Sequence, residues 1–332
     1  MNGPAATRPR TVFFGSPAFA VPSLARVAAE TDLVAVVCQP DRPAGRGQAL
    51  GEPAVKQAVK RMAAGVPIVQ PEKLRTGSFE AALREFRADL FVVVAYGRIL
   101  PPSILELPRL GPWNVHGSVL PRLRGAAPIQ WAVINGDLEA GISIMRMEAG
   151  LDTGPVAAVA TTEISDADTA GTLADRLATL GADLLAATLP RIVDGSVVTT
   201  PQDEAKATLA PMLRKEDGRL AFHQPARVVS ARARGVDPWP GATALLDGQP
   251  IKLFGPRVVR GAGDAAPAKD TSPDTSPGTS PGTVVGIDAD GVRIACADGE
   301  IQFAEIQLPG RRRLSAAAAA TGRAIAIGAR LG

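Results

Sequence analysis

The chain's 332 residues, 46% of them hydrophobic, exceed what one hydrophobic core usually holds, so two packed domains are expected. Its apolar runs are far shorter than the roughly 20 residues of a membrane span, its N-terminus lacks a hydrophobic secretion segment, and two cysteines are too few for a disulfide framework or a structural zinc site. With a net charge of only +3, this composition excludes a membrane protein and a secreted disulfide scaffold, and it predicts a cytoplasmic protein with no metal.

The first half of the chain, after a tail over 1–9 that we expect to be disordered, alternates strand-like and helix-like segments. Short runs rich in Val and Phe predict strands, and apolar residues at helical spacing predict helices. The strands are expected over 10–14, 33–39, 90–95, 113–115 and 142–147, and the helices over 19–30 and 54–64. Such alternation is typical of a parallel sheet covered on both faces. Because ligands bind beyond the carboxyl ends of strands in such sheets, site residues are expected in 15–19, 96–100, 116–124 and 150–155.

The second half begins with a long amphipathic helix, predicted between Asp168 and Gly195, whose leucines form one stripe. This helix is expected to close a first domain over 10–195, and the irregular segment 196–212 is expected to be a linker. From 213 to 332, short alternating segments with Asp-Gly turns predict a small antiparallel barrel or sandwich. Within it, the TSP repeats of 264–283 have almost no apolar side chain to bury and predict a disordered surface loop. The alternating segments are 242–246, 251–254, 284–287, 292–295 and 301–306.

Charge is unevenly distributed along the chain. Residues 1–205 carry 19 basic and 21 acidic side chains, whereas residues 206–332 carry 17 and 12. Because lysine and arginine neutralise phosphates, the C-terminal part is the better candidate to bind a nucleic acid. A basic excess of this size is equally often the ordinary surface of a protein, so charge alone leaves both interpretations open.

Three polar side chains suggest a chemical site. Asn114 and His116 are two residues apart in an extended segment and therefore point the same way, and Asp152 lies in a glycine-rich turn. The amide of Asn114 can donate to the oxyanion of a tetrahedral intermediate, and His116 can donate as well or move a proton. Asp152 would orient the imidazole or a relay water. This set suits acyl or formyl transfer, although a structural histidine and a turn-forming aspartate are the commoner interpretation, and no spacing here suits a metal.

The sequence around these residues resembles a known family. The stretch from Asn114 to Gln130, NVHGSVLPRLRGAAPIQ, and the stretch 150–154, GLDTG, are similar to the two signatures of the folate-dependent formyltransferases. The resemblance implies that Asn114, His116 and Asp152 are the catalytic residues. Four further stretches resemble the methionyl-tRNA branch of that family: 14–20, 39–47, 93–101 and 213–218.

The resemblance also implies a Rossmann-like catalytic domain followed by a C-terminal β-barrel, related to oligonucleotide-binding (OB) folds, that binds tRNA. It implies 10-formyltetrahydrofolate as co-substrate, initiator methionyl-tRNA as acceptor and a monomer with no obligate protein partner. Arg42 and Arg46, on a loop that contains Pro and Gly, are placed against the tRNA, where fixed cations can bracket phosphates. The Leu120–Pro121 peptide bond is expected to be cis. The residues placed at the folate site are Ser118, Val119, Leu120, Pro121, Arg98, Ile99 and Leu100.

Two other functions remain open. Another member of the same family would share the three site residues but act on a different acceptor. A non-catalytic tRNA-binding protein could have kept the fold. A NAD-dependent oxidoreductase is disfavoured, because 14–19 holds one glycine and not a Gly-x-Gly-x-x-Gly run.

Overall fold

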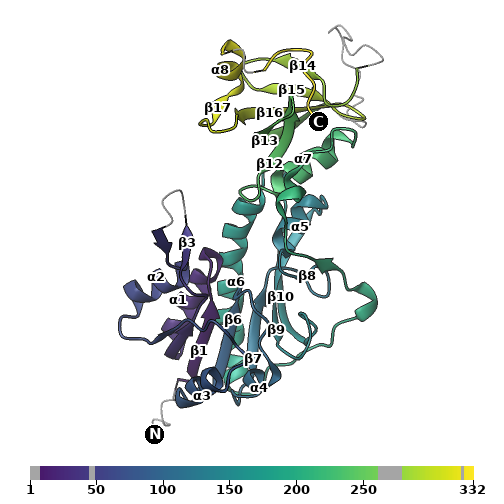
Figure 1. The fold of residues 1–332 in the computed structure, drawn as a ribbon. Helices are drawn as coiled ribbons and strands as arrows, with labels where there is room; N and C mark the ends of the chain where they lie inside the picture. Colours follow the sequence, from purple (N-terminus) through teal and green to yellow (C-terminus); the bar gives the residue numbers. More distant parts are fainter. Residues whose placement is uncertain (1–7, 45–48, 261–278, 323–324) are drawn as a thin grey trace. The chain divides into compact units, whose positions relative to one another are not determined.

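The computed structural model describes residues 8–44, 49–260, 279–322 and 325–332. Their contacts group into two compact units, which are described separately below, and Figure 1 gives the element labels. Most of the predicted tail and of the predicted insertion, namely 1–7 and 264–278, lies outside the described residues. Unit 1 comprises Met1–Pro128, Glu139–Thr162 and Ala174–Pro211, and unit 2 comprises Ile129–Leu138, Glu163–Leu173 and Met212–Gly332.

Unit 1 is built on a seven-stranded sheet with the order β10-β9-β7-β6-β1-β2-β5 (Figure 1). The strands from β7 to β5 are parallel to their neighbours, as predicted. β9 runs antiparallel to β7, with Trp113 opposite Arg146 and His116 opposite Ser143, so the predicted parallel sheet is extended at this edge by an antiparallel strand. A buried antiparallel strand has the same apolar pattern as a parallel one, so the sequence could not distinguish them. The strands are β1 (Arg10–Gly15), β2 (Asp32–Val37), β5 (Ile68–Val69), β6 (Leu90–Val94), β7 (Pro112–His116), β9 (Glu139–Arg146) and β10 (Val156–Glu163).

One face of this sheet carries an aromatic cluster. Phe14 packs against Phe91, with ring centroids 5.1 Å apart, and Tyr96 meets Phe14 edge-on at 5.6 Å. Phe79 of α3 (Gly77–Glu85) belongs to the same cluster and covers this face. Because β1 and β6 are buried along almost their whole length, their sequences are continuously apolar, which is the pattern that predicted them.

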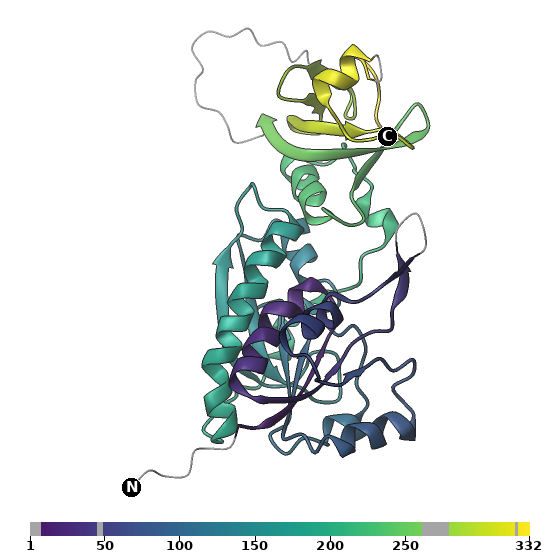
Figure 2. The same ribbon diagram turned by 90° about the vertical axis from the view of Figure 1, so that its left-hand side faces the viewer.

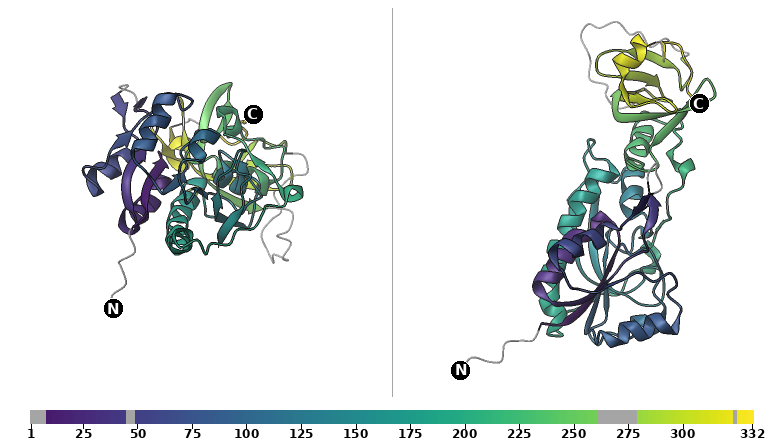
Figure 3. Two further views of the ribbon diagram at one scale, coloured as in Figure 1. Left: turned by 90° about the horizontal axis from the view of Figure 1, so that it is seen from below. Right: turned by 60° about the vertical axis from the view of Figure 1, so that its left-hand side comes forward.

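The opposite face is covered by the long helix predicted between Asp168 and Gly195, which the structure shows as α6 (Ala170–Val193). Gly181 allows α6 to approach the sheet closely, because a Cβ at this position would lie 3.0 Å from the Val115 side chain. α1 (Val21–Glu30) lies beside α6 (Figure 2 and Figure 3), and Arg26 of α1 forms an ion pair with Asp183 of α6. Val115 of β7 therefore points toward the helix side of the sheet.

Shorter elements complete unit 1, and several of them lie in the segment predicted as a linker. Within 196–212, η2 and β11 are regular elements, and β11 pairs with β8 in the first half of the chain. This segment is thus hydrogen-bonded to unit 1 as far as Ala210. The shorter elements are η1 (Ala18–Ala20), β3 (Arg42–Ala44), β4 (Ala49–Gly51), α2 (Ala54–Met62), α4 (Pro102–Leu105), β8 (Arg124–Gly125), η2 (Glu204–Lys206) and β11 (Leu209–Ala210).

Unit 2 contains a six-stranded antiparallel sheet with the order β12-β13-β16-β15-β14 and with β17 on β16, as the alternating segments predicted. The turn at Asp247 and Gly248 joins β12 to β13 with φ values of 49° and 75°, the left-handed pair that a tight hairpin requires. The elements are α5 (Pro128–Ile134), η3 (Lys215–Gly218), α7 (Ala226–Gly235), β12 (Ala242–Leu246), β13 (Gln249–Arg260), β14 (Val284–Ile287), β15 (Val292–Ala295), β16 (Glu300–Gln307), β17 (Leu314–Ser315) and α8 (Ala316–Thr321).

A buried arginine explains why 163–173 groups with unit 2. Arg234 of α7 is 8% exposed, and its guanidinium donates to the carbonyl oxygens of Ser165 and Asp168 at 3.1 and 3.0 Å. The units therefore do not divide the chain at a single linker, because a segment that precedes most of α6 is held by α7.

Candidate active site

Alternation along β7 decides where its polar side chains point. Val115 faces α6, so Asn114 and His116 point to the opposite face of the sheet. His116 is 5% exposed, and Asn114 is half-buried. Because β7 is hydrogen-bonded between β6 and β9, both side chains start from a rigid backbone.

Asp152 meets these two side chains from the loop between β9 and β10. Its carboxylate accepts hydrogen bonds from the backbone N–H of Gly125 at 2.9 Å and from Nδ2 of Asn114 at 3.5 Å. Its Oδ2 atom lies 3.7 Å from Nδ1 of His116. The amide, the imidazole and the carboxylate that the sequence singled out therefore lie together.

The path of the chain to Asp152 differs from the expectation that this residue follows the carboxyl end of a parallel strand. Since β9 is antiparallel to β7, its last residue, Arg146, lies opposite Trp113 near the start of β7. The loop folds back across the sheet face, and Asp152 adopts a left-handed φ of 52°. Gly154 permits this path, because a Cβ there would lie 1.8 Å from the carbonyl oxygen of Arg146.

The imidazole of His116 is held on both sides. Its Nε2 atom lies 3.2 Å from the carbonyl oxygen of Leu123, and since a carbonyl oxygen can only accept, Nε2 is the donor in this contact. On its other side, Nδ1 faces the carboxylate of Asp152. These two contacts fix the position and the plane of the ring, as a residue that stabilises a developing oxyanion or moves a proton requires.

The loop after β7, residues 117–125, is shaped by its own polar groups. Ser118 is buried, and its hydroxyl donates to the carbonyl oxygen of Arg122 at 2.6 Å. The N–H of Leu120 donates to Oγ of Ser143 at 3.0 Å. The peptide bond between Leu120 and Pro121 is cis, as predicted. With the loop held in this shape, residues 119–122 form one wall of a hollow.

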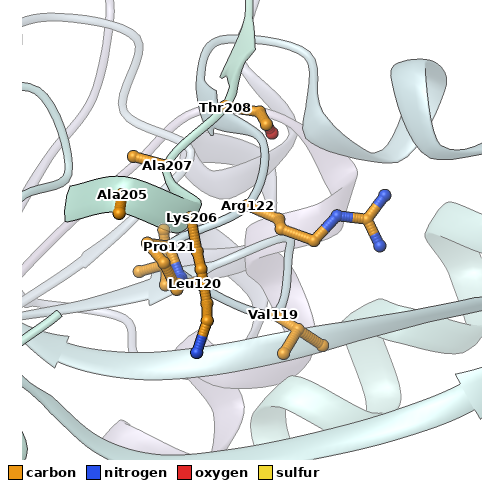
Figure 4. A pocket seen from close by; sticks show the side chains of 8 residues that line it. All are labelled: Val119, Leu120, Pro121, Arg122, Ala205, Lys206, Ala207 and Thr208. Atoms are coloured by element: carbon orange, nitrogen blue, oxygen red, sulfur yellow. The ribbon is translucent and has the colours of Figure 1, made fainter. Parts of the chain in front are cut away.

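This hollow has a volume of about 540 Å³ (Figure 4). One wall is formed by Val119, Leu120, Pro121 and Arg122, and the other by the segment 205–208. Its volume lies in the range of roughly 300–1,000 Å³ that small-molecule sites have. Three of the seven residues assigned to the folate site thus line it, whereas Ser118 points into the loop.

The remaining residues assigned to the folate site follow β6 and are not among those that line this hollow. Arg98 donates to the carbonyl oxygens of Pro71 and Glu72 at 3.0 and 2.8 Å. Leu100 packs into the core, and Ile99 is 74% exposed. The structure therefore places them at the carboxyl edge of the parallel strands, with only Arg98 and Ile99 reaching solvent.

Two buried polar atoms at this edge have no hydrogen-bond partner among the described residues, namely Oη of Tyr96 and Oε1 of Gln39. The side-chain N–H of Gln39 donates to the carbonyl oxygen of Tyr96 at 3.0 Å, which ties the ends of β2 and β6 together. Burial raises the pKa of Tyr96 to about 12, so its phenol keeps its proton at neutral pH and can donate. Buried polar atoms without a partner are few in native proteins, so these two are candidates for contact with a bound water, an ion or a ligand group.

The basic loop predicted to contact tRNA is a hairpin of β3 and β4. Arg42 is exposed and lies opposite Gly51, whereas Arg46 lies outside the described residues. Asp41 at the base of the hairpin accepts hydrogen bonds from Gln70 and Lys56, which hold the pKa of its carboxyl below its usual value. The hairpin thus starts from an anchored residue.

The segment 200–210 contributes contacts that the sequence analysis did not predict. Gln202 donates to the carbonyl oxygen of Asp152 at 2.8 Å, and Oγ1 of Thr208 accepts from the N–H of Leu123 at 2.9 Å. This segment has no periodic pattern, so nothing local marked it. Arg124 is buried and therefore requires a partner, but its burial is known only from the structure, so it gave no signal in the sequence.

The described ranges contain neither a candidate membrane span nor a cluster of metal ligands. No helix there combines the length and the apolar character that a membrane span requires. In the same part of the chain, His, Cys, Asp and Glu side chains form no group of three or more that could hold a metal ion.

Solved structures share the fold. The chain aligns with HypX from Aquifex aeolicus in complex with tetrahydrofolic acid at a TM-score of 0.63 and 15% identity, covering 94% of this chain and 47% of the HypX chain, so it spans about half of that protein. It aligns with WlaRD, a sugar 3N-formyl transferase, at a TM-score of 0.62 and 15% identity, covering 92% of this chain and 99% of WlaRD.

Sequence comparison identifies the family as well as the fold. A family model described as formyl transferase matches residues 10–189, and one described as formyl transferase, C-terminal domain, matches residues 212–324. A methionyl-tRNA formyltransferase of Sorangium cellulosum (strain So ce56) is 46% identical over 97% of this chain and 99% of its own length. Another, of Anaeromyxobacter dehalogenans (strain 2CP-1 / ATCC BAA-258), is 48% identical over 94% of this chain and 96% of its own length. The chain therefore belongs to the formyl transferase family, in the branch of the methionyl-tRNA formyltransferases.

Proposed function

We propose that this protein transfers the formyl group of 10-formyltetrahydrofolate to the α-amino group of initiator methionyl-tRNA, giving formylmethionyl-tRNA for translation initiation. The relatives that align with this chain over nearly their full length are named methionyl-tRNA formyltransferase. The observation that carries the proposal is the meeting of the Asn114 amide, the His116 imidazole and the Asp152 carboxylate on one face of the sheet.

The reaction exchanges one carbon–nitrogen bond for another. The neutral amine of the methionyl group attacks the formyl carbon, a tetrahedral oxyanion forms, and the bond from that carbon to N10 of the folate breaks. The amine loses one proton and N10 gains one, so atoms and charge balance through proton transfer. The protein must therefore stabilise one oxyanion and move one proton.

Each of the three residues has a role that its contacts support. The Asn114 amide gives one N–H to Asp152, and its second N–H remains for the oxyanion, a contribution of about 3–4 kcal/mol where such donors have been removed from other enzymes. His116 donates to the oxyanion or carries the proton to N10. Asp152 holds the imidazole in the orientation that both roles require.

We assign folate binding to the loop after β7 and to the turn after β6. Val119, Leu120 and Pro121 form an apolar wall against which an aromatic ring can pack, and Ser118 holds the shape of that wall from inside. Arg98, Ile99 and Leu100 form the turn after β6 near the free polar atoms of Tyr96 and Gln39, which suit a pterin with several donors and acceptors.

We assign tRNA contacts to Arg42 and Arg46, since Arg42 is exposed on a hairpin with an anchored base. The basic excess of residues 206–332 supports a further contribution from unit 2. We further propose that the protein acts in the cytoplasm, where both of its substrates are expected. The family resemblance implies that it acts there as a monomer without an obligate protein partner.

The test is a formylation assay with the purified protein, 10-formyltetrahydrofolate and methionyl-tRNA, comparing initiator with elongator tRNA. We expect formylmethionyl-tRNA from the initiator and much less from the elongator. A dTDP-amino sugar serves as an alternative acceptor, because WlaRD is a sugar formyl transferase of the same fold. Formylation of the sugar but of neither tRNA would reject the proposed acceptor, and no transfer to any acceptor would reject formyl transfer itself.

A further inference from the structure

The side chain of Gln202 uses all four of its hydrogen-bonding positions. Nε2 donates to the carbonyl oxygens of Asp152 and Gly154 at 2.8 and 2.7 Å. Oε1 accepts from Nε and Nη2 of Arg124 at 3.0 and 2.8 Å. One amide group thus joins the loop that carries Asp152 to the loop that follows β7.

Arg124 is itself held in place. Its side chain is 6% exposed, and it pairs with the carboxylate of Glu204 through two hydrogen bonds of 2.8 and 2.7 Å. The next residue, Gly125, donates its backbone N–H to the carboxylate of Asp152. The two consecutive residues of β8 therefore support Asp152 twice, directly at its side chain and through Gln202 at its main chain.

Asp152 needs such support. Its φ of 52° lies in the left-handed region, which is uncommon for residues other than glycine even though aspartate tolerates it better than most, so contacts around it help to keep it there. The segment that bears Gln202 is in turn pinned on both sides, because Thr200 pairs with Val156 of β10 and Ala210 pairs with Gly125. The Nε2 group of Gln202 therefore has a fixed position, and its hydrogen bonds hold the loop that carries Asp152.

We propose that Gln202 is a positioning residue, which holds the main chain of Asp152 so that its carboxylate faces His116. Its effect on catalysis rests on the proposed function. The residue lies between the stretches 10–189 and 212–324 that the family models match, so neither match includes it. Gln202 does not need to touch either substrate for this role.

The first test replaces Gln202 by glutamate, which has the same size and still accepts from Arg124 but presents oxygen to the two carbonyl groups. We expect kcat to fall at least tenfold, as it does when a supporting contact behind a site residue is lost, while KM for folate and for methionyl-tRNA changes less than about threefold. Gln249→Glu, the same change at an exposed hairpin position of unit 2, is the matched control and should leave kcat unchanged.

A double-mutant cycle then shows whether Gln202 acts through Asp152. In an Asp152→Asn background, Gln202→Glu should lower kcat by less than about twofold, because the group that it positions no longer has its charge. If the tenfold loss persists in full in that background, the role of Gln202 is general support of the fold, and the proposal is wrong.

A spectroscopic readout does not depend on activity. The chain has two histidines, His116 in the site and His223 on the surface of unit 2, so the imidazole ¹⁵N signals of the labelled protein report both. Gln202→Glu should shift the signals of His116 and leave those of His223 in place. Unmoved His116 signals in the folded variant would overturn the proposal even if the protein proved to have another activity.

Glu204→Gln provides a second variant in case Gln202→Glu does not fold. The Glu204 side chain is 70% exposed, so its replacement is tolerated, but Arg124 loses its counter-charge. We expect a two- to fivefold fall in kcat together with a smaller shift of the His116 signals. If wild-type protein forms no formylmethionyl-tRNA, the proposed function fails, whereas the histidine signals still decide whether Gln202 positions the site.

Discussion

The two halves of the site are held in different ways. Asn114 and His116 stand on β7, a buried strand with hydrogen-bonded neighbours on both sides. Asp152 stands on a loop with a left-handed φ and depends on contacts from Gly125 and Gln202. The backbone hydrogen bonds of the sheet fix the position of a strand residue independently of the loops. The position of a loop residue depends on a few specific contacts.

Effects on the reaction and effects on stability are therefore expected to be separable in one half of the site and coupled in the other. Removing a side chain from β7 should affect the reaction and leave the backbone in place. Changes beneath the loop of Asp152 should affect the reaction and the stability of the loop together. Substitutions in the two halves of the site should therefore differ in their effects on kcat and on the free energy of unfolding.

His116→Ala should lower kcat for formyl transfer by at least roughly two orders of magnitude, because it removes the group that donates to the oxyanion or moves the proton. KM for folate should change less than about threefold, since the imidazole does not line the apolar hollow. Single-turnover formylation measures the loss. His223→Ala, at an exposed position, is the control, and a fall of less than tenfold for His116→Ala would argue against a catalytic role.

Asp152→Gly should separate the carboxylate from the strain of its backbone. Glycine adopts the φ of 52° without strain, which offsets part of the loss of the hydrogen bonds from Gly125 and Asn114, so the urea midpoint should change little, whereas kcat should fall roughly 30- to 100-fold because the imidazole loses its support. Urea denaturation and formylation of the same preparation give both quantities. Loss of activity only in proportion to loss of folded protein would show that Asp152 has a structural role alone.

Gly125→Ala should weaken the loop itself. A Cβ would lie 2.7 Å from the carbonyl oxygen of Ala210, and the φ of 122° disfavours any side chain, so we expect a loss of about 1–3 kcal/mol in the free energy of unfolding and roughly tenfold in kcat. Gly65→Ala, with a φ of 98° but open space around it, controls for strain without the contact. Equal activity losses in both variants would refute the role of the Gly125 contact.

Arg42→Ala should have the smallest effect. We expect KM for methionyl-tRNA to rise roughly fivefold and its dependence on salt to weaken by about one phosphate contact, with folate binding unchanged. Arg61→Ala, which removes the same charge from the exposed face of α2, is the control. A similar rise in KM for both substrates would contradict a contact with tRNA.

Much of the frame follows from local pattern. Continuous apolar runs identified β1, β2 and β6, since strands buried on both faces have no polar side. Alternation along β7 placed Asn114 and His116 on one face. The direction of β9 could not be predicted, because burial imposes the same residues on either direction, and with it the route of the chain to Asp152 remained hidden.

From the sequence alone, three side chains could be proposed for the chemistry and two of them placed on one face of a strand, because side-chain periodicity is a local property of the backbone. The hydrogen bond from Gln202 to the carbonyl oxygen of Asp152, 50 residues away, became visible only in the folded structure. The same holds for the hydrogen bond from Leu123 to Thr208, 85 residues away. Such contacts depend on how distant segments pair, and the partner of a segment without periodicity cannot be predicted from its own sequence.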